Sequence, residues 1–244
     1  MKFDALISLA PRTSEDFSKN LKAFYQEVTA SPTNSIILAP EVAFSDFCYD
    51  KMQEASEFTA TILQKLLPLS ENKAFAFTAI DKQNEHYFNN AYILYRGQVV
   101  YKRAKNKLFT LGNEHHYFQP DHFQKHPKPQ TDIIEIQGTK IGVLVCFELR
   151  FIDEWQKLKG CDVILIPAMW GKNRIVHYRT LSHALAVFHQ CFVVSANGAN
   201  LCRDNSIYTP FGHVQRNNRK ICNALVVDKQ EIKKMRKYVA TDND

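Results

Sequence analysis

The chain has 244 residues, of which 45% are hydrophobic and 23% charged, and its formal net charge is +6. These proportions are those of an ordinary globular protein, and they exclude a fibrous or intrinsically disordered chain. A chain of this length can bury a substantial core without disulfides or metal ions, and α/β folds often reach it as one unit, so we expect a single domain over residues 1–244.

The spacing of the cysteines and the length of the apolar runs indicate the cellular compartment. The six cysteines are spread without a CxxC pair or the dense spacing of a small secreted domain; they are Cys48, Cys146, Cys161, Cys191, Cys202 and Cys222. The first ten residues carry Asp4 in an apolar stretch too short for a secretion signal, and no apolar run approaches membrane-spanning length. We therefore expect a reduced, cytoplasmic protein with no membrane partner.

The first half of the chain alternates apolar runs with amphipathic segments. Short β-branched or aromatic runs predict strands at 3–10, 35–41, 73–80, 87–96 and 99–104. The helical period predicts a helix over 13–30, capped by Thr13 or Ser14, and a second over 52–70, closed by Pro68.

The second half repeats this alternation. We predict strands at 132–137, 140–146, 162–170, 191–197, 206–214 and 221–228, with helices over 151–160 and 176–190. Strands alternating with helices indicate an α/β layered architecture, and strands without clean alternation indicate cover on both faces. The hairpin-like pairs of strands indicate a mixed sheet. The basic segment 229–238 predicts the solvated face of a terminal helix rather than a nucleic-acid contact, because neither a stacking platform nor a known motif accompanies it.

Three predicted strands run into a chemically reactive residue. Glu41 and Cys146 end their strands, and Lys105 follows another. Sites of α/β folds collect at the carboxyl ends of strands, and a cysteine nucleophile needs a base or a cation to become a thiolate. A carboxylate can be that base and a lysine can stabilise an oxyanion, so the set suits acyl transfer. From residue types alone, an inert buried thiol at Cys146 stays an open alternative.

The strings around these residues resemble one known family. "APE" followed by "FSDF", "KNKLF" nine residues ahead of "EHHYF", "VLVCFELRF", "PAMW", "HQCFVVSAN" and "YTPFG" occur in the order and spacing of the carbon–nitrogen hydrolase (nitrilase) superfamily. "CFELRF" is most similar to the C-Y-D-x-R-F string of its ω-amidase branch. The resemblance covers nearly the whole chain. It implies a four-layer αββα sandwich of mixed sheets flanked by helices, and a Glu-Lys-Cys amidase without a metal or organic cofactor.

The resemblance also implies roles for individual residues. Glu41 falls at the general base, Cys146 at the nucleophile and Lys105 at the catalytic lysine. Glu114 falls at a second glutamate that orders the lysine and the substrate. These roles imply a hydrolase that cleaves the non-peptide C–N bond of a small primary amide, releasing ammonia and a carboxylate through a cysteine thioester. Lys105 and the N–H of Phe147 would hold the oxyanion, and a homodimer is the expected assembly.

Two departures from the family pattern matter. Lys107 stands where the family's usual histidine would be, and Lys105 is preferred to Lys102 or Lys107 because of its register before Leu108. The R-A-x-E-N-Q string that often precedes the "CFVVSAN" strand is replaced over 185–190, where its Arg and Glu are missing. The alternative is therefore a catalytically altered member that acts as a binding or scaffold subunit.

Substrate recognition is predicted from residues near these positions. A guanidinium can clasp a carboxylate bidentately, so Arg150 suits a small amide with a distal carboxylate, such as an ω-amide of a 2-oxo dicarboxylic acid. The competing role for Arg150 is a structural salt bridge to Glu148 or Asp153. Further candidates for the substrate pocket are Trp170, Phe44, Phe147 and Tyr117 as walls, and Asn173 and Arg174 beyond them.

The histidines offer two alternative enzyme classes. A zinc site could use His115, His116, His122 and His126, but nothing matches H-E-x-x-H or paired cysteines, so ordinary loop histidines are favoured. A Cys–His protease could pair Cys146 with His177 or His183, but the local signatures of such proteases are missing.

Overall fold

The computed structural model describes residues 1–125, 131–198, 200, 202–218 and 221–241. Helices and strands alternate along them as expected. The strands are β1 (Ala5–Leu9), β2 (Ser35–Leu38), β3 (Ala74–Gln83), β4 (His86–Tyr95), β5 (Gln98–Ala104), β6 (Ile133–Ile136), β7 (Thr139–Val143), β8 (Val163–Ala168), β9 (Phe192–Asn197), β10 (Asp204–Tyr208), β11 (Val214–Arg216) and β12 (Cys222–Val226). The α-helices are α1 (Phe17–Ala30), α2 (Met52–Leu66), α3 (Glu114–Tyr117), α4 (Ile152–Gln156), α5 (Ile175–His189) and α6 (Glu231–Tyr238).

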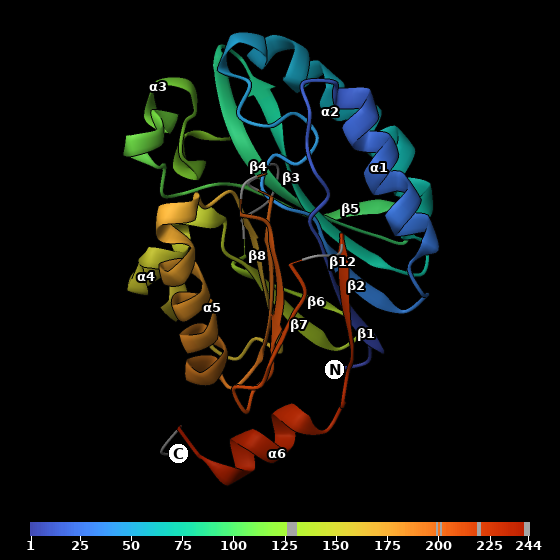
Figure 1. Ribbon diagram of the computed structural model, residues 1–244, viewed down its shortest axis with the longest axis vertical. Helices are drawn as coiled ribbons and strands as arrows, with labels where there is room; N and C mark the ends of the chain where they lie inside the picture. Colours follow the sequence, from blue (N-terminus) through green and yellow to red (C-terminus); the bar gives the residue numbers. More distant parts are fainter. Residues whose placement is uncertain (126–130, 199, 201, 219–220, 242–244) are drawn as a thin grey trace.

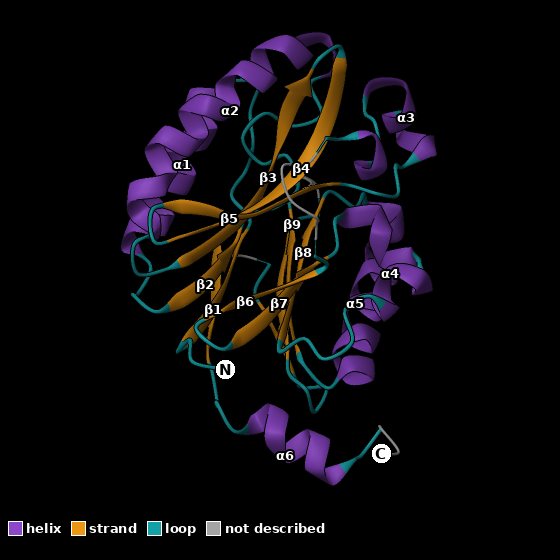
Figure 2. Ribbon diagram, turned by 180° about the vertical axis from the view of Figure 1, so that it is seen from behind, coloured by secondary structure: helices purple, strands orange, loops and turns teal. Residues whose placement is uncertain are grey.

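The strands form two mixed, six-stranded sheets. One has the order β12-β1-β2-β3-β4-β5 and the other β11-β10-β9-β8-β7-β6. Figures 1 and 2 show α1 and α2 on the outer side of the first sheet, with α4 and α5 on the outer side of the second. The predicted four-layer αββα sandwich is therefore confirmed. Among the described residues, none of the helices combines the length and apolar character needed to cross a bilayer.

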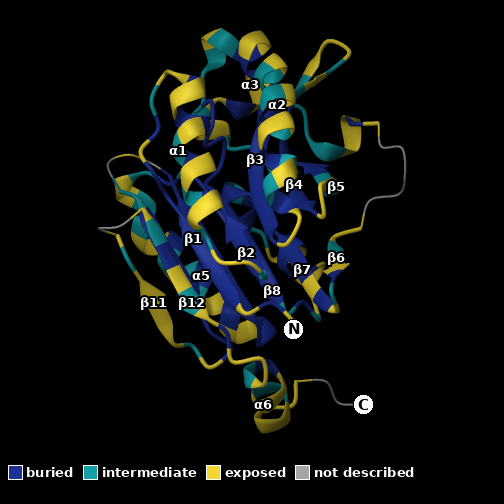
Figure 3. Ribbon diagram, turned by 90° about the vertical axis from the view of Figure 1, so that its right-hand side faces the viewer, coloured by how far each residue is buried: buried dark blue, intermediate teal, exposed yellow. Residues whose placement is uncertain are grey.

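The hydrophobic patterns account for these layers. The "ALISL", "SIIL" and "VILIPA" runs of β1, β2 and β8 are buried at every position, as expected for strands covered on both faces. Figure 3 shows the buried strands behind helices whose outer faces are exposed. One apolar cluster fills the space between the sheets and under α5, and another lies between the first sheet and α1 and α2.

Three predicted boundaries are wrong, and the two at strand ends affect the site. The cap of α1 is Asp16, whose Oδ1 accepts the Lys19 N–H at 2.9 Å, so neither Thr13 nor Ser14 caps it. The strand predicted over 35–41 ends at Leu38, three residues before Glu41. The strand predicted over 140–146 ends at Val143, and Cys146 begins a short 3-10 helix. Irregular backbone thus carries both reactive residues beyond their strands.

Candidate active site

A buried ion cluster joins three segments that are far apart in the sequence. Lys105, just after β5, places Nζ 2.8 Å from Glu41 Oε1 and 2.8 Å from the Glu114 carboxylate. Glu41 follows β2, and Glu114 begins α3. The exposed fraction is 0% for Glu41 and Lys105 and 3% for Glu114. Asn89 Nδ2 donates to Glu41 Oε1 at 2.9 Å, and Glu114 Oε2 accepts the Phe109 N–H at 3.0 Å, so both carboxylates have fixed orientations.

One cation between two carboxylates sets the protonation states of this cluster. Burial disfavours the Lys105 ammonium, but Glu41 and the other acidic groups around it raise its pKa above the ordinary value. Burial raises the pKa of Glu41, and the shared Lys105 charge only partly offsets this. Glu41 Oε2 has no hydrogen-bond partner among the described residues. The cluster therefore holds a poised carboxylate with one oxygen free to accept a proton.

Cys146 begins the 3-10 helix Cys146–Arg150, shortly after β7, and its backbone is strained. Its φ of +50° is uncommon for a residue with a side chain, and the residue is only 8% exposed. Burial and the Glu41 carboxylate raise the pKa of the thiol well above its ordinary value, with Lys105 acting in the opposite direction. At neutral pH the resting group is thus a thiol rather than a thiolate. Nucleophilic attack by this sulfur needs a base. Glu41 and Glu114 both line the same pocket, and Glu41 is the one whose charge has the larger effect on the pKa of the thiol.

The backbone beside Glu41 is strained as well. Val42 has a φ of +40°, a genuine outlier for a β-branched residue. The Val42 N–H donates to Thr78 Oγ1 at 2.6 Å. The Val42 carbonyl accepts the N–H groups of Ser45 and Asp46. The surrounding contacts therefore hold Glu41 in an orientation that a relaxed chain would not adopt.

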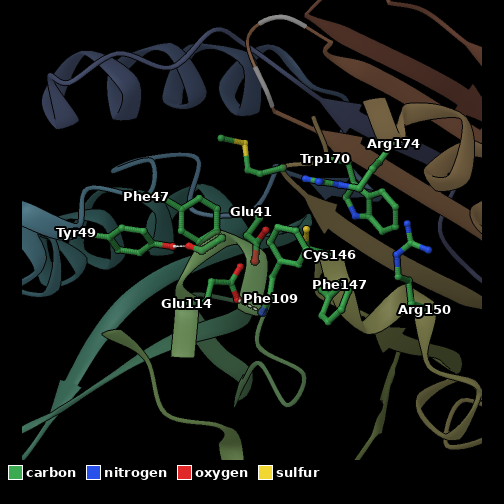
Figure 4. Close-up of a pocket in the computed structure, with 12 residues that line it drawn as sticks. Glu41, Phe47, Tyr49, Phe109, Glu114, Cys146, Phe147, Arg150, Trp170 and Arg174 are labelled. Atoms are coloured by element: carbon green, nitrogen blue, oxygen red, sulfur yellow. Dashed lines mark hydrogen bonds between the residues drawn. The ribbon is translucent and has the colours of Figure 1, made fainter. Parts of the chain in front are cut away.

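A pocket of about 230 Å³ opens onto these groups. It is lined by Glu41, Phe47, Tyr49, Phe109, Gly112, Glu114, Cys146, Phe147, Arg150, Met169, Trp170 and Arg174. Figure 4 shows the two glutamates at its centre, with Phe47 and Tyr49 on one side and Trp170 with the two arginines on the other. Its size suits a small molecule, and five of its twelve lining residues are aromatic.

Two guanidinium groups line this pocket. Arg150 lies over the Trp170 ring at 4.7 Å from its centroid, and Arg174 lies over Phe109 at 4.8 Å. Arg150 Nη2 is also 3.0 Å from His177 Nδ1. Neither arginine has a carboxylate partner among the residues that the structure describes, so both can meet an anionic ligand.

The predicted salt bridges of Arg150 are wrong. Glu148 instead makes a bidentate pair with Arg103, and Asp153 pairs with Lys107 at 2.7 Å. Both acids already have cations close to them in space, although those cations are more than forty residues away in the sequence.

Some of the residues predicted as pocket walls line the pocket, and others do not. Phe147 and Trp170 line the pocket, as does Arg174. Phe44 does not: it is 1% exposed and packs between Phe24 and Phe77 in the core under α1, because the turn over residues 41–45 directs its ring inward. Tyr117 is also outside the pocket lining. It stacks on the lining residue Tyr49 with ring centroids 4.0 Å apart, so it can act only through that ring.

Sequence reasoning missed several lining residues. Phe47 and Phe109 lie inside the "FSDF" and "KNKLF" strings, but nothing in those strings indicates which aromatic faces the pocket. Tyr49 is held by a hydrogen bond from its hydroxyl to the Gly112 carbonyl at 2.8 Å, a contact across more than sixty residues. Such long-range pairings leave no local signal.

The metal and protease alternatives gain no support. No cluster of His, Cys, Asp or Glu in the described residues could hold a metal ion, and His126 lies outside them. No histidine lines the pocket within the described part of the chain: His177 contacts Arg150, and His183 contacts the Gly212 carbonyl at 2.7 Å. The altered segment 185–190 does not line the pocket either.

Comparisons with known proteins agree with this architecture. The profile of the Carbon-nitrogen hydrolase family matches residues 5–214. The chain is 27% identical over 213 residues to 2-oxoglutaramate amidase from Bacillus subtilis, covering 81% of this chain and 79% of that protein. It is 23% identical over 207 residues to omega-amidase YafV from Escherichia coli K12, covering 82% and 78%.

The solved structures agree in fold. A CN-hydrolase superfamily protein from Xanthomonas campestris superposes with a TM-score of 0.84 at 17% identity, covering 98% of this chain and 95% of that one. A Saccharomyces cerevisiae member of branch 10 of the nitrilase superfamily gives 0.83 at 18% identity, covering 99% and 96%. This chain belongs to the carbon–nitrogen hydrolase family.

Proposed function

We propose that the protein hydrolyses a small primary amide to ammonia and a carboxylate, with Cys146 as the nucleophile. The observation that carries this proposal is the position of Cys146 in one pocket with the buried Glu41–Lys105–Glu114 cluster. A neutral thiol, a carboxylate with a free oxygen and a cation held between two acids are the parts that covalent acyl transfer requires.

The proposed reaction has two halves. Glu41 takes the proton of the Cys146 thiol as the sulfur bonds to the amide carbon, and the Glu41 acid then protonates the departing nitrogen as the C–N bond breaks. In the second half Glu41 takes a proton from water, whose oxygen attacks the thioester. The C–S bond then breaks, and the sulfur takes this proton from the Glu41 acid, which restores the thiol and the carboxylate.

Two donors suit the negative oxygen that forms in each half. The Lys105 ammonium is one, and the Phe147 N–H is the other. This N–H lies in the first turn of the 3-10 helix that begins at Cys146, where backbone donors lack an acceptor within the helix. Glu114 keeps Lys105 protonated and in place. Such preorganised donors contribute about 3–4 kcal/mol each to transition-state stabilisation.

We propose an amide with a distal carboxylate as the substrate class, and the ω-amide of a 2-oxo dicarboxylic acid as the leading candidate. Arg150 and Arg174 line the pocket without acidic partners among the described residues. A bound carboxylate or keto oxygen would satisfy their donors. The names of the relatives, 2-oxoglutaramate amidase and omega-amidase, support the same class.

The function is tested by ammonia release from primary amides of equal length, with and without a terminal carboxylate. Release from the carboxylated amides at a higher kcat/KM supports the proposal. The absence of release from every amide by folded protein would contradict it and favour the binding or scaffold alternative.

Replacing Arg150 with glutamine is expected to raise KM for a carboxylated amide by about 10- to 100-fold, since a hydrogen bond to a charged group contributes about 1.5–3 kcal/mol. We expect kcat to change much less, and KM for an uncharged amide to stay the same. The matched control is Lys107→Gln, which removes a cation that pairs with Asp153 outside the pocket. Equal effects of the two substitutions would rule out Arg150 as a carboxylate ligand.

The pH dependence follows from Glu41. Activity needs its carboxylate, and burial raises its pKa, so kcat/KM should fall as pH falls through a value above that of an ordinary glutamate. Lys105 has a raised pKa and remains protonated, so no decline is expected from it on the alkaline side up to about pH 9. Initial rates between about pH 4 and pH 9 check both limbs. An acid limb at or below the ordinary glutamate pKa would be inconsistent with Glu41 as the base.

We also propose that two copies associate through the outer face of α5. Val176, Val187 and Phe188 on this helix are 66%, 45% and 58% exposed. Val176 is in the first turn of α5, whereas Val187 and Phe188 are adjacent in its last turn, and adjacent exposed apolar side chains are typical of a subunit contact. Phe188→Glu is expected to halve the mass measured by light scattering after gel filtration. Val226→Glu, at an 84% exposed position on β12, should leave it unchanged. A wild-type monomer would refute the association.

A further inference from the structure

Arg103 and Glu148 form a buried ion pair between the two sheets. Arg103 lies in β5 of the first sheet, and Glu148 lies in the 3-10 helix that follows β7 of the second. Nη1 donates to Oε1 at 2.8 Å and Nη2 donates to Oε2 at 2.7 Å. The exposed fractions are 4% and 0%. Although burial acts to raise it, Arg103 holds the pKa of Glu148 below its ordinary value, so the pair stays charged.

The pair holds the backbone on both sides of Lys105. Glu148 Oε1 accepts the Asn106 N–H at 2.6 Å, and Arg103 Nη1 donates to the Ala104 carbonyl at 3.0 Å. These two groups belong to the peptides immediately after and before Lys105. The direction in which the Lys105 side chain leaves the backbone is therefore fixed by the pair.

The same pair holds the backbone that leads into Cys146. Glu148 Oε2 accepts the Val145 N–H at 2.7 Å, and Arg103 Nη2 donates to the Val143 carbonyl at 2.7 Å. These contacts fix the two residues of irregular chain between the end of β7 and the strained Cys146. Each oxygen of Glu148 thus contacts a different reactive segment, one from each sheet.

All five N–H donors of Arg103 are used, because Nε donates to the Tyr101 hydroxyl at 3.0 Å. A lysine would keep the charge but could not reproduce this planar set of contacts. We propose that Arg103 and Glu148 are positioning residues that set the separation of Lys105 and Cys146. The kcat test of this proposal rests on the proposed function. The rate at which the Cys146 thiol is alkylated tests the same geometry without it.

The first test is Arg103→Lys, which changes no formal charge. Because misplacement of reacting groups by about 1 Å can cost about 100-fold, we expect kcat to fall by about 10- to 100-fold with KM within about threefold of wild type. The matched control is Arg179→Lys. Arg179 pairs with Asp204, a fully buried carboxylate outside the pocket, at 2.6 Å. The Arg179→Lys enzyme carries the same arginine-to-lysine substitution and should keep the wild-type kcat.

The second readout is the rate at which iodoacetamide alkylates Cys146, followed by peptide mass spectrometry. We expect about tenfold slower alkylation in Arg103→Lys and the wild-type rate in Arg179→Lys. If the wild type hydrolyses no amide, the proposed function fails while this comparison still decides the positioning role. Tyr101→Phe removes only the Nε contact. Tyr101→Phe replaces Arg103→Lys in this test if that variant does not fold, and we expect it to slow the alkylation of Cys146 by about threefold.

A purely structural role predicts a different pattern. Arg103→Lys and Arg179→Lys would then lower the melting temperature, while kcat per folded molecule and the alkylation rate stayed at wild-type values in both. That result overturns the proposal, as would equal losses of kcat in the two variants.

Discussion

Cys146→Ala is expected to lower ammonia release by about 10⁴-fold or more, because loss of the nucleophile removes the covalent route altogether. The variant should fold normally, since the change removes only the sulfur, at the wall of an existing pocket, and keeps the Cβ on the same backbone. Ammonia release at saturating amide concentration measures the effect. KM need not change, because the pocket walls and both arginines are untouched.

The control for this prediction is Cys222→Ala, the same change in β12, where the side chain is partly exposed and does not line the pocket. It should retain wild-type activity. Activity that survives in Cys146→Ala, or that is lost equally in Cys222→Ala, would exclude the proposed nucleophile.

Glu41→Gln is expected to lower kcat by about 10²- to 10⁴-fold, because the amide keeps the shape of the side chain but cannot take the thiol proton. Lys105 keeps Glu114 as a partner at 2.8 Å, so the cluster retains an ion pair. Glu54→Gln, on the outer side of α2, is the matched control and should leave kcat unchanged. If Glu41→Gln retained wild-type kcat, another group would have to act as the base.

Glu41→Gln is expected to lower kcat without lowering the melting temperature. Folding raises the pKa of Glu41, so its contribution to stability is present below the unfolded-state pKa and is lost as pH rises through the folded-state value. At neutral pH the Glu41 charge thus does not favour folding, and a neutral glutamine should keep or raise the melting temperature. A thermal melt at neutral pH checks this. A large fall in melting temperature would mean that the ion pair with Lys105 outweighs burial.

The convergence of Glu41 and Lys105 was predictable because β2 and β5 belong to one sheet and their carboxyl ends lie at the same edge, whereas Cys146 follows a strand of the other sheet. The register of "KNKLF" before "EHHYF" selected Lys105 and Glu114, and the structure brings both together with Glu41. Local sequence could not show that Cys146 lies beyond its strand, because an unbroken apolar run does not reveal where the ladder stops. The backbone before Cys146 is also held from the opposite sheet, where Arg103 Nη2 donates to the Val143 carbonyl at 2.7 Å.

The errors have a common cause. Phe44 was predicted as a pocket wall from its closeness in sequence to Glu41, but the turn after Glu41 directs its ring into the core. Glu148 was predicted as a partner of Arg150, two residues away, whereas its partner Arg103 lies in the other sheet. Pairings across the two sheets depend on how the layers pack, which no local pattern encodes.

The most direct test of the proposed chemistry is mass spectrometry of the wild-type protein after acid quenching during turnover of a carboxylated amide. A cysteine thioester predicts that the peptide containing Cys146 gains the mass of the substrate minus ammonia, and that no other cysteine peptide does. Ammonia release with the acyl group on a different peptide would contradict Cys146 as the nucleophile.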